Sequence, residues 1–122
     1  MVSAAEREIE RLEIILDQIG RIETRLASVA FTEFAADADL SDLIAFRVQT
    51  IGENCHRLSS PLKRRHALPW IDIYGMRNII SHDYARISPA AVWAVAMDHL
   101  GSIRVMAEIE LARSLSAADS AV

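Results

Sequence analysis

The sequence contains little of the chemistry that several common classes of protein need. Its single cysteine, Cys55, cannot form an internal disulfide, and without a CxxC pair or a His/Cys cluster it predicts no zinc site or other metal site. We interpret Cys55 as a small buried apolar residue rather than a reactive thiol. Only four glycines and three prolines occur in 122 residues, and no glycine-rich phosphate-binding loop is among them.

Long apolar runs are also absent. No stretch approaches the ~18 residues of a membrane-spanning helix, and the opening MVSAAEREIERLEIIL carries acids where a secretion signal would be apolar. We therefore expect a cytoplasmic protein that does not associate with membranes. Because 52% of the residues are apolar, a chain of this length can bury a sizeable core and form one domain.

Positive charge is scarce overall but concentrated in the middle of the chain. The net charge is −4, which argues against a protein that coats nucleic acid through bulk positive charge. Between Arg47 and Arg86, however, seven Lys and Arg residues face three Asp and Glu residues. Such a basic centre in an acidic chain could hold a polyanion at one place, and ordinary solvated helix faces are an equally good explanation.

Apolar residues recur at spacings of three and four, which predicts amphipathic helices rather than strands. In the first third they lie at Ile9, Leu12, Ile15, Ile19, Ile22, Leu26 and Val29. Ser3 followed by Glu6 matches a capping box, so a long helix should begin there. A second helix is predicted over Leu40–Leu58, and Gly52 inside it indicates the close approach of another backbone.

Prolines mark the later elements. A basic connector precedes Pro69, which suits the first turn of a third helix that continues to Ile80. Pro89 repeats this start signal for a fourth helix that reaches Ile109.

The predicted fold class is therefore all-α, an antiparallel helical bundle of four to five helices. Residues 1–113 should form the single helical domain, and the small residues of 114–122 should form a frayed tail. Because the first helix is much longer than the third, part of its apolar stripe, or the face of the third helix, could be left for a second subunit.

The densest group of polar side chains in an apolar setting lies around the end of the third helix. It contains Arg77, Asn78, Ser81, His82 and Tyr84. On one straight helix Arg77 and His82 would diverge by ~140°. They can converge if the helix ends or bends near Ser81, or if two copies of the segment face each other across a dimer axis.

This set of residues suits RNA cleavage without a metal. Histidine can take the proton of the ribose 2′-OH or supply one to the leaving 5′-oxygen, since its ordinary pKa of ~6.5 lies near working pH. Arginine grips phosphate oxygens through two bonds and stays charged. Asn78 and Tyr84 could orient the phosphate or the imidazole. Spacing alone is a weak signal, because an arginine and a histidine five apart on a helix are commonly a surface charge and a structural histidine.

Several stretches together resemble one known family. Arg77-Asn78-x-x-x-His82-x-Tyr84 is similar to the R-x4-H-x-Y signature of HEPN-domain toxins, in particular the HepT-like ribonucleases of bacterial toxin–antitoxin systems. Ile51-Gly52-Glu53-Asn54, Pro69-Trp70-Ile71-Asp72-Ile73 with Gly75-Met76, and Val92-Trp93 also resemble family motifs. The resemblance covers roughly residues 7–113.

This resemblance implies a homodimer with both R-x4-H segments in one cleft, acting as a metal-independent endoribonuclease without a cofactor. Arg77 and His82 would be the catalytic pair, and Asn78 the accompanying polar residue. The implied partner is a nucleotidyltransferase antitoxin of the MNT-domain type, which would transfer AMP to Tyr84. A bulky anionic nucleotide beside His82 would block the cleft and repel RNA.

Two other classes of function remain open. The same helical dimer could be a non-catalytic module that docks a nucleotidyltransferase or binds a nucleotide. A helix-turn-helix DNA-binding protein fits poorly, because no short glycine-containing turn places basic residues at the front of a recognition helix.

A few further residues have weaker signals. Lys63, Arg64 and Arg65 form the densest positive patch and are the candidate for a secondary RNA contact, although a solvated connector is the more usual role of such a run. Glu53 could pair with an arginine, including Arg77. Trp70, like Trp93, is in phase with apolar neighbours and fits a core position better than a base-stacking one.

Overall fold

The computed structural model describes residues 1–79 and 88–120, and all of its regular elements there are helical. The α-helices are α1 Ala4–Leu26, α2 Phe31–Ala36, α3 Ala38–His56, α4 Ser60–Arg64, α5 Trp70–Gly75, α6 Pro89–Asp98 and α7 Leu100–Ser120, with a 3-10 segment, η1, at Met76–Asn78. The all-α prediction is therefore confirmed.

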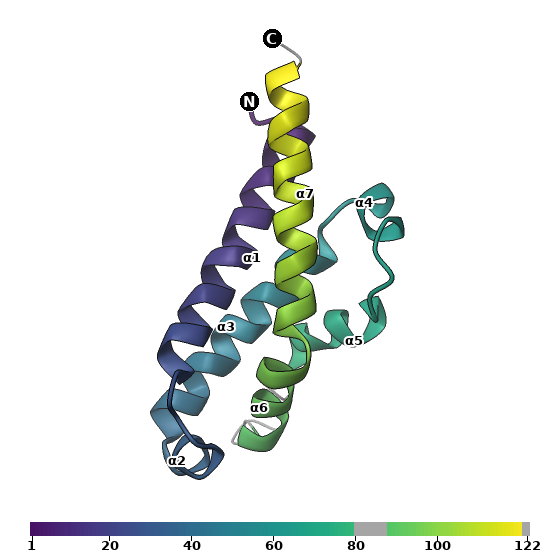
Figure 1. Ribbon diagram of the computed structural model, residues 1–122. Helices are drawn as coiled ribbons and strands as arrows, with labels where there is room; N and C mark the ends of the chain where they lie inside the picture. Colours follow the sequence, from purple (N-terminus) through teal and green to yellow (C-terminus); the bar gives the residue numbers. More distant parts are fainter. Residues whose placement is uncertain (80–87, 121–122) are drawn as a thin grey trace.

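Three long helices form the body of the bundle. α1 packs against both α3 and α7, and α3 also contacts α5, η1 and α6. Figure 1 shows that α1 and α7 run in opposite directions, so that the start of α1 and the end of α7 lie at the same end of the bundle, while α4 and α5 form an arm beside them. Within the described residues, no helix combines the length and apolar content needed to cross a membrane.

The apolar stripe predicted for the first helix forms one side of the core. Its buried members are Leu12, Ile15, Ile19, Ile22 and Leu26. Ser3 Oγ accepts a hydrogen bond from the backbone N–H of Glu6 at 3.1 Å, which confirms the predicted helix start. Cys55 is fully buried among the apolar side chains of α3, as its interpretation as a core residue requires.

Short helices form where the sequence pattern predicted none. α2 lies between the first and second predicted helices, and Phe34 is fully buried there with its ring 5.2 Å from that of Trp93. α4 lies inside the predicted connector, where Ser59 Oγ accepts from the N–H of Leu62 and the Leu62 side chain is fully buried. Each helix is too short for a periodic signal, and tertiary burial of one side chain stabilises it.

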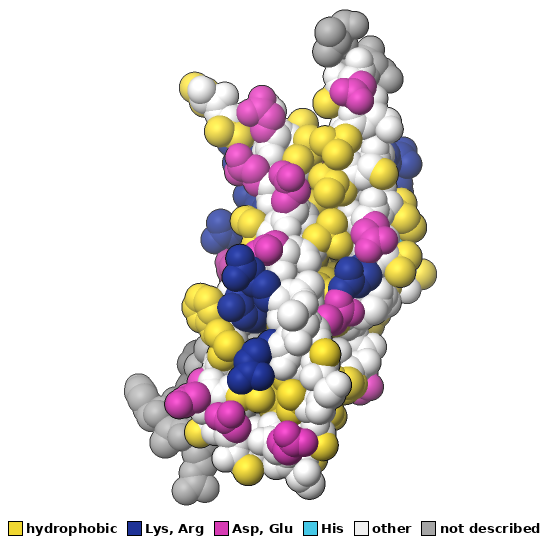
Figure 2. All heavy atoms as spheres, turned by 60° about the vertical axis from the view of Figure 1, so that its left-hand side comes forward, with side chains coloured by type: hydrophobic (Ala, Val, Ile, Leu, Met, Phe, Trp, Pro, Cys, Tyr) yellow, Lys and Arg dark blue, Asp and Glu magenta, His cyan; other side chains and the backbone are white. Residues whose placement is uncertain are grey.

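The predicted fourth helix is divided at His99. α6 contacts α2 and α3, whereas α7 runs along α1, so one straight helix could not serve both surfaces. At its far end α7 is helical to Ser120, so residues 114–120 differ from the predicted frayed tail. Val105, Ile109 and Leu115 remain about half exposed on α7, and Figure 2 shows apolar side chains gathered between the two long helices at this end.

The predicted close approach at Gly52 is present. A Cβ atom at this position would lie 2.9 Å from the backbone nitrogen of Arg77 and 2.9 Å from Cβ of Met76. The third helix also ends earlier than predicted: α5 stops at Gly75, and the chain tightens into η1 rather than continuing to Ile80. Glycine on α3 thus allows the backbone of η1 to lie directly against it.

Gly52→Ala should destabilise the protein by about 1–3 kcal/mol, because the added methyl group must push η1 away from α3. Gly20→Ala is the matched control, since a Cβ there meets nothing within 4 Å and alanine should stabilise α1 by up to ~1 kcal/mol. Urea unfolding followed by circular dichroism measures both. Equal stabilisation by the two substitutions would contradict the contact.

Candidate active site

The arginine of the R-x4-H segment lies at the junction of α3 and η1. Arg77 Nε donates to Glu53 Oε2 at 3.1 Å, and Arg57 Nε donates to Glu53 Oε1 at 3.2 Å. The sequence suggested Arg77 as one possible partner of Glu53, and the structure contains this ion pair. The side chains of Arg77 and Glu53 are 37% and 41% exposed, so the pair is not buried. Arg77 is held at the surface with part of its guanidinium group facing solvent.

The two arginines change the acidity of Glu53. Partial desolvation raises the pKa of this carboxyl group, but the charges and hydrogen bonds of Arg77 and Arg57 outweigh it and hold the pKa below its ordinary value. Glu53 is therefore ionised throughout the neutral range. An ionised carboxylate orients the guanidinium and leaves its remaining N–H groups free for an anion.

The remaining members of the predicted site are placed only in part. Asn78 is exposed at the end of η1, next to Arg77, as the sequence order requires. His82 and Tyr84 lie outside the described residues, so the convergence of Arg77 with His82 stays a prediction. α5 ends at Gly75, so Arg77 lies on η1 and not on the helix that the sequence predicted.

A second group of side chains lies next to this ion pair on α3. His56 follows Glu53 by three residues, is exposed, and meets the ring of Tyr74 edge to face at 5.2 Å between centroids. Lys63 Nζ lies 4.6 Å from the centroid of the Tyr74 ring and donates to the carbonyl of His56 at 2.7 Å. Sequence reasoning gave Tyr74 no role, because its partners come from two distant segments.

The basic connector is largely engaged within the protein. Arg65 Nη2 and His66 Nε2 both contact the buried carboxylate of Glu110, at 2.6 and 2.7 Å. The hydrogen bond from Arg65 is the largest cause of the lowered pKa of Glu110, against the effect of burial. Lys63 and Arg65 bind partners inside the chain, whereas Arg64 is exposed and has no such partner among the described residues.

The two tryptophans are half buried and pack against the core. Trp70 Nε1 donates to the carbonyls of Lys63 and His66, both at 3.1 Å, which ties α5 to the connector. Trp93 packs against Phe34. The core interpretation therefore holds for both side chains.

The described residues contain no group of three or more His, Cys, Asp and Glu side chains placed to hold a metal ion. Burial raises the pKa of the Cys55 thiol to about 12, so it remains protonated and unreactive at neutral pH. Cys55 therefore serves as packing. The polar groups that remain available at the surface on η1 are the guanidinium of Arg77 and the amide of Asn78.

The chain is similar to known ribonucleases. The family described as "Ribonuclease HepT-like" matches residues 15–109. A protein named "Putative RNase TTE0752" from Caldanaerobacter subterraneus subsp. tengcongensis is 26% identical over 90 residues, which cover 73% of this chain and 80% of the relative. No solved structure matches the chain. The family match spans most of the bundle, including α3 and η1, and the chain belongs to the HepT-like ribonuclease family.

Proposed function

We propose that the protein is the toxin of a bacterial toxin–antitoxin system and acts in the cytoplasm as a metal-independent endoribonuclease. Arg77, His82 and Asn78 carry the reaction. The observation that supports this most directly is the partly exposed side chain of Arg77, which Glu53 binds at the start of the R-x4-H segment. A cation held in this way is ready to bind a phosphodiester before the reaction begins.

The reaction is an attack of the ribose 2′-oxygen on the adjacent phosphorus. A general base removes the 2′-OH proton, the new P–O2′ bond forms, and the P–O5′ bond breaks. The products are a 2′,3′-cyclic phosphate and a 5′-OH, whose oxygen receives a proton from a general acid. His82 fits either proton transfer, and Arg77 stabilises the charge that develops on the phosphoryl oxygens. DNA lacks the 2′-OH and is not a substrate.

A homodimer would place two such segments around one phosphodiester. One protomer presents Arg77 and Asn78 on a single edge of the bundle, and a facing copy could supply the imidazole. Exposed apolar side chains on both long antiparallel helices, among them Ile14 and Ile109, support association between copies.

The proposed antitoxin is a nucleotidyltransferase of the MNT-domain type that modifies Tyr84. The phenolic oxygen attacks the α-phosphorus of ATP and forms a P–O bond, the bond between the α- and β-phosphates breaks, and pyrophosphate and the phenolic proton leave, so AMP remains on the tyrosine. The added phosphate carries negative charge and the nucleoside occupies space beside His82. Both effects oppose RNA binding at Arg77.

Arg77→Ala and His82→Ala should each abolish RNA cleavage and growth arrest, with a loss of at least about 100-fold in rate, since each removes a group that acts on the transition state. His56→Ala is the matched histidine control and should retain activity. The assay is cleavage of RNA by purified protein in EDTA. Equal cleavage by the wild type and all variants would refute the proposed ribonuclease activity of this protein. A wild-type protein that binds RNA or a nucleotide without cleaving RNA would support the alternative of a non-catalytic module.

Glu53→Gln should lower kcat for RNA cleavage several-fold with little change in fold, because Arg77 keeps a hydrogen-bond acceptor but loses its charged partner.

The ion pair between Glu53 and Arg77 should also make stability depend on pH. Because the pKa of Glu53 is lowered in the folded protein, the pair stabilises the fold above the ordinary carboxyl pKa, and this stabilisation is lost as pH falls through the lowered value. The pair is exposed to solvent, so this contribution is below about 1 kcal/mol.

Thermal unfolding at neutral pH and near pH 3 measures this effect. The difference in stability between wild type and Glu53→Gln should shrink at the lower pH. Glu13→Gln, on the exposed face of α1, is the control. A difference that persists after protonation would mean that the carboxylate charge does not hold Arg77.

If a nucleotidyltransferase of the MNT-domain type is encoded next to this protein, coexpression with it should add one AMP to Tyr84, where the nucleotide would lie two residues from His82 and block the cleft. Mass spectrometry of the digested protein locates the group, and Tyr84→Phe should remain unmodified and toxic. Tyr74, the other tyrosine of the chain, is the internal control and should carry no AMP. AMP on Tyr74, or none on the Tyr84 peptide, would contradict the proposal.

A further inference from the structure

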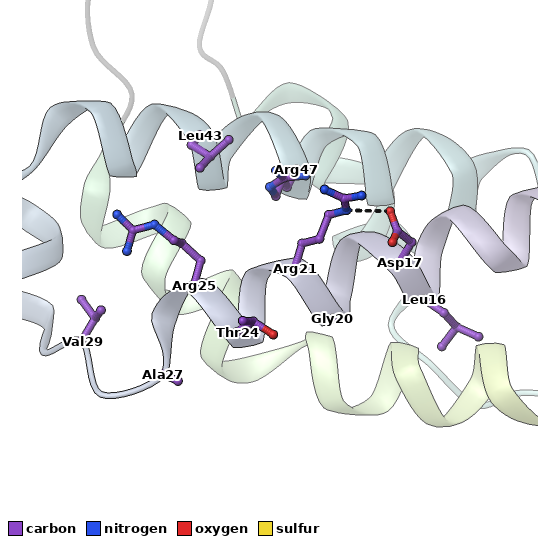
Figure 3. A pocket seen from close by; sticks show the side chains of 10 residues that line it. All are labelled: Leu16, Asp17, Gly20, Arg21, Thr24, Arg25, Ala27, Val29, Leu43 and Arg47. Atoms are coloured by element: carbon purple, nitrogen blue, oxygen red, sulfur yellow. Dashed lines mark hydrogen bonds and ion pairs between the residues drawn. The ribbon is translucent and has the colours of Figure 1, made fainter.

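Three arginines that are far apart in the sequence line one groove between α1 and α3. Arg21 and Arg25 lie one turn apart on α1, and Arg47 comes from α3. The groove has a volume of about 870 Å³ and is open to solvent. Figure 3 shows the three guanidinium groups between the two helices, and a group of basic side chains stands on this face of the molecule in Figure 2.

The charge of this groove is only partly neutralised. Arg21 Nε donates to Asp17, the one carboxylate that lines the groove, at 2.9 Å. Arg47 Nη1 donates to the neutral amide oxygen of Gln18 at 3.0 Å, and Arg25 has no ion pair within residues 1–79 and 88–120. The lining therefore carries two net positive charges in a chain whose net charge is −4.

The uncharged walls fit a nucleic-acid strand. Leu16, Val29 and Leu43 provide apolar surface beside the arginines. Gly20 leaves the space above α1 open, because even a Cβ atom added there would meet nothing within 4 Å. Guanidinium groups match phosphate oxygens in geometry, and apolar side chains can contact ribose and base faces. Arg21 and Arg25 are about 6 Å apart along the helix surface, close enough to hold neighbouring phosphates of one strand.

We propose that the groove lined by Arg21, Arg25 and Arg47 binds the phosphate backbone of the RNA substrate. This inference rests on the proposed ribonuclease function and adds a second contact, distinct from Arg77. It also replaces the connector as the main basic surface for RNA, because Lys63 and Arg65 have partners inside the chain. Arg21 and Arg25 are exposed and Arg47 is half-buried, and among the described residues one N–H of Arg21 and one of Arg47 are engaged.

Helix α3 connects the groove to the candidate active site. Arg47 precedes Glu53 by six residues, which is about 9 Å along the helix axis, and 100° per residue places the two side chains on different sides of α3. An RNA strand must therefore pass around the helix to occupy both places. Binding through the groove should accordingly require a strand of several nucleotides, whereas a dinucleotide reaches only one site.

The test uses binding rather than cleavage. In the full-length His82→Ala protein, fluorescence anisotropy measures the affinity for a labelled single-stranded RNA of about 20 nucleotides over a range of salt concentrations. Arg25→Glu should weaken binding by about tenfold or more and reduce the slope of log affinity against log salt by about 0.7. Thr24→Glu, which adds a carboxylate to the same wall and removes no arginine, should weaken binding as well.

Arg113→Glu is the matched control, because it makes the same change of charge at an exposed position on the outer part of α7. It should change the affinity less than twofold. Circular dichroism melting checks that every variant is folded, which we expect because Thr24 and Arg25 are exposed on α1.

The outcomes separate this inference from the proposed function. If the wild type cleaves RNA but Arg25→Glu and Arg113→Glu bind RNA with equal affinity, the proposal that the groove binds RNA is wrong. The proposed ribonuclease function is then unaffected. Displacement of the RNA by AMP at equal phosphate concentration would identify a mononucleotide site and also overturn it. RNA binding that depends on Arg25 in a protein without RNase activity would instead refute the proposed function while retaining the groove.

Discussion

The candidate site depends on the contact between α3 and η1. Gly52 allows the backbone of Met76 and Arg77 to lie against α3, and the next residue, Glu53, binds the Arg77 side chain. Adjacent positions on one helix thus restrain both the main chain and the guanidinium group of the same arginine. If the register of α3 shifted by one residue, both restraints would be lost together, because successive side chains point about 100° apart.

The rest of the fold supports this contact from two sides. Along α1, the packed stripe holds α3 in place, and Ser59 after α3 donates its N–H to Glu8 at 2.6 Å. On the other side, Arg65 and His66 bind the buried Glu110 of α7, which fixes the connector that leads into α5. An unpaired carboxylate at Glu110 would be costly, so these two basic side chains have a structural role.

Positive charge in this protein is consequently used in two ways. The contiguous run at Lys63–Arg65 resembles an exposed basic patch in the sequence. In the structure, Lys63 donates to the carbonyl of His56 and Arg65 donates to Glu110. Arg21 and Arg47 are far apart in the sequence, yet they line the same groove. Linear charge density therefore does not show where positive side chains gather when helices from distant segments pack side by side.

Local patterns in the sequence determined the long helices and their buried faces, because a repeat of 3.6 residues and a capping serine at Ser3 are properties of one segment. They also determined that Gly52 would meet another backbone, and that Arg77 and Asn78 would stand together. The partner of Glu53, the break at His99 and the arginine groove depended on the tertiary structure. Each arises from contacts between segments far apart in the chain, and a local pattern carries no information about which distant side chain will fill the space beside it.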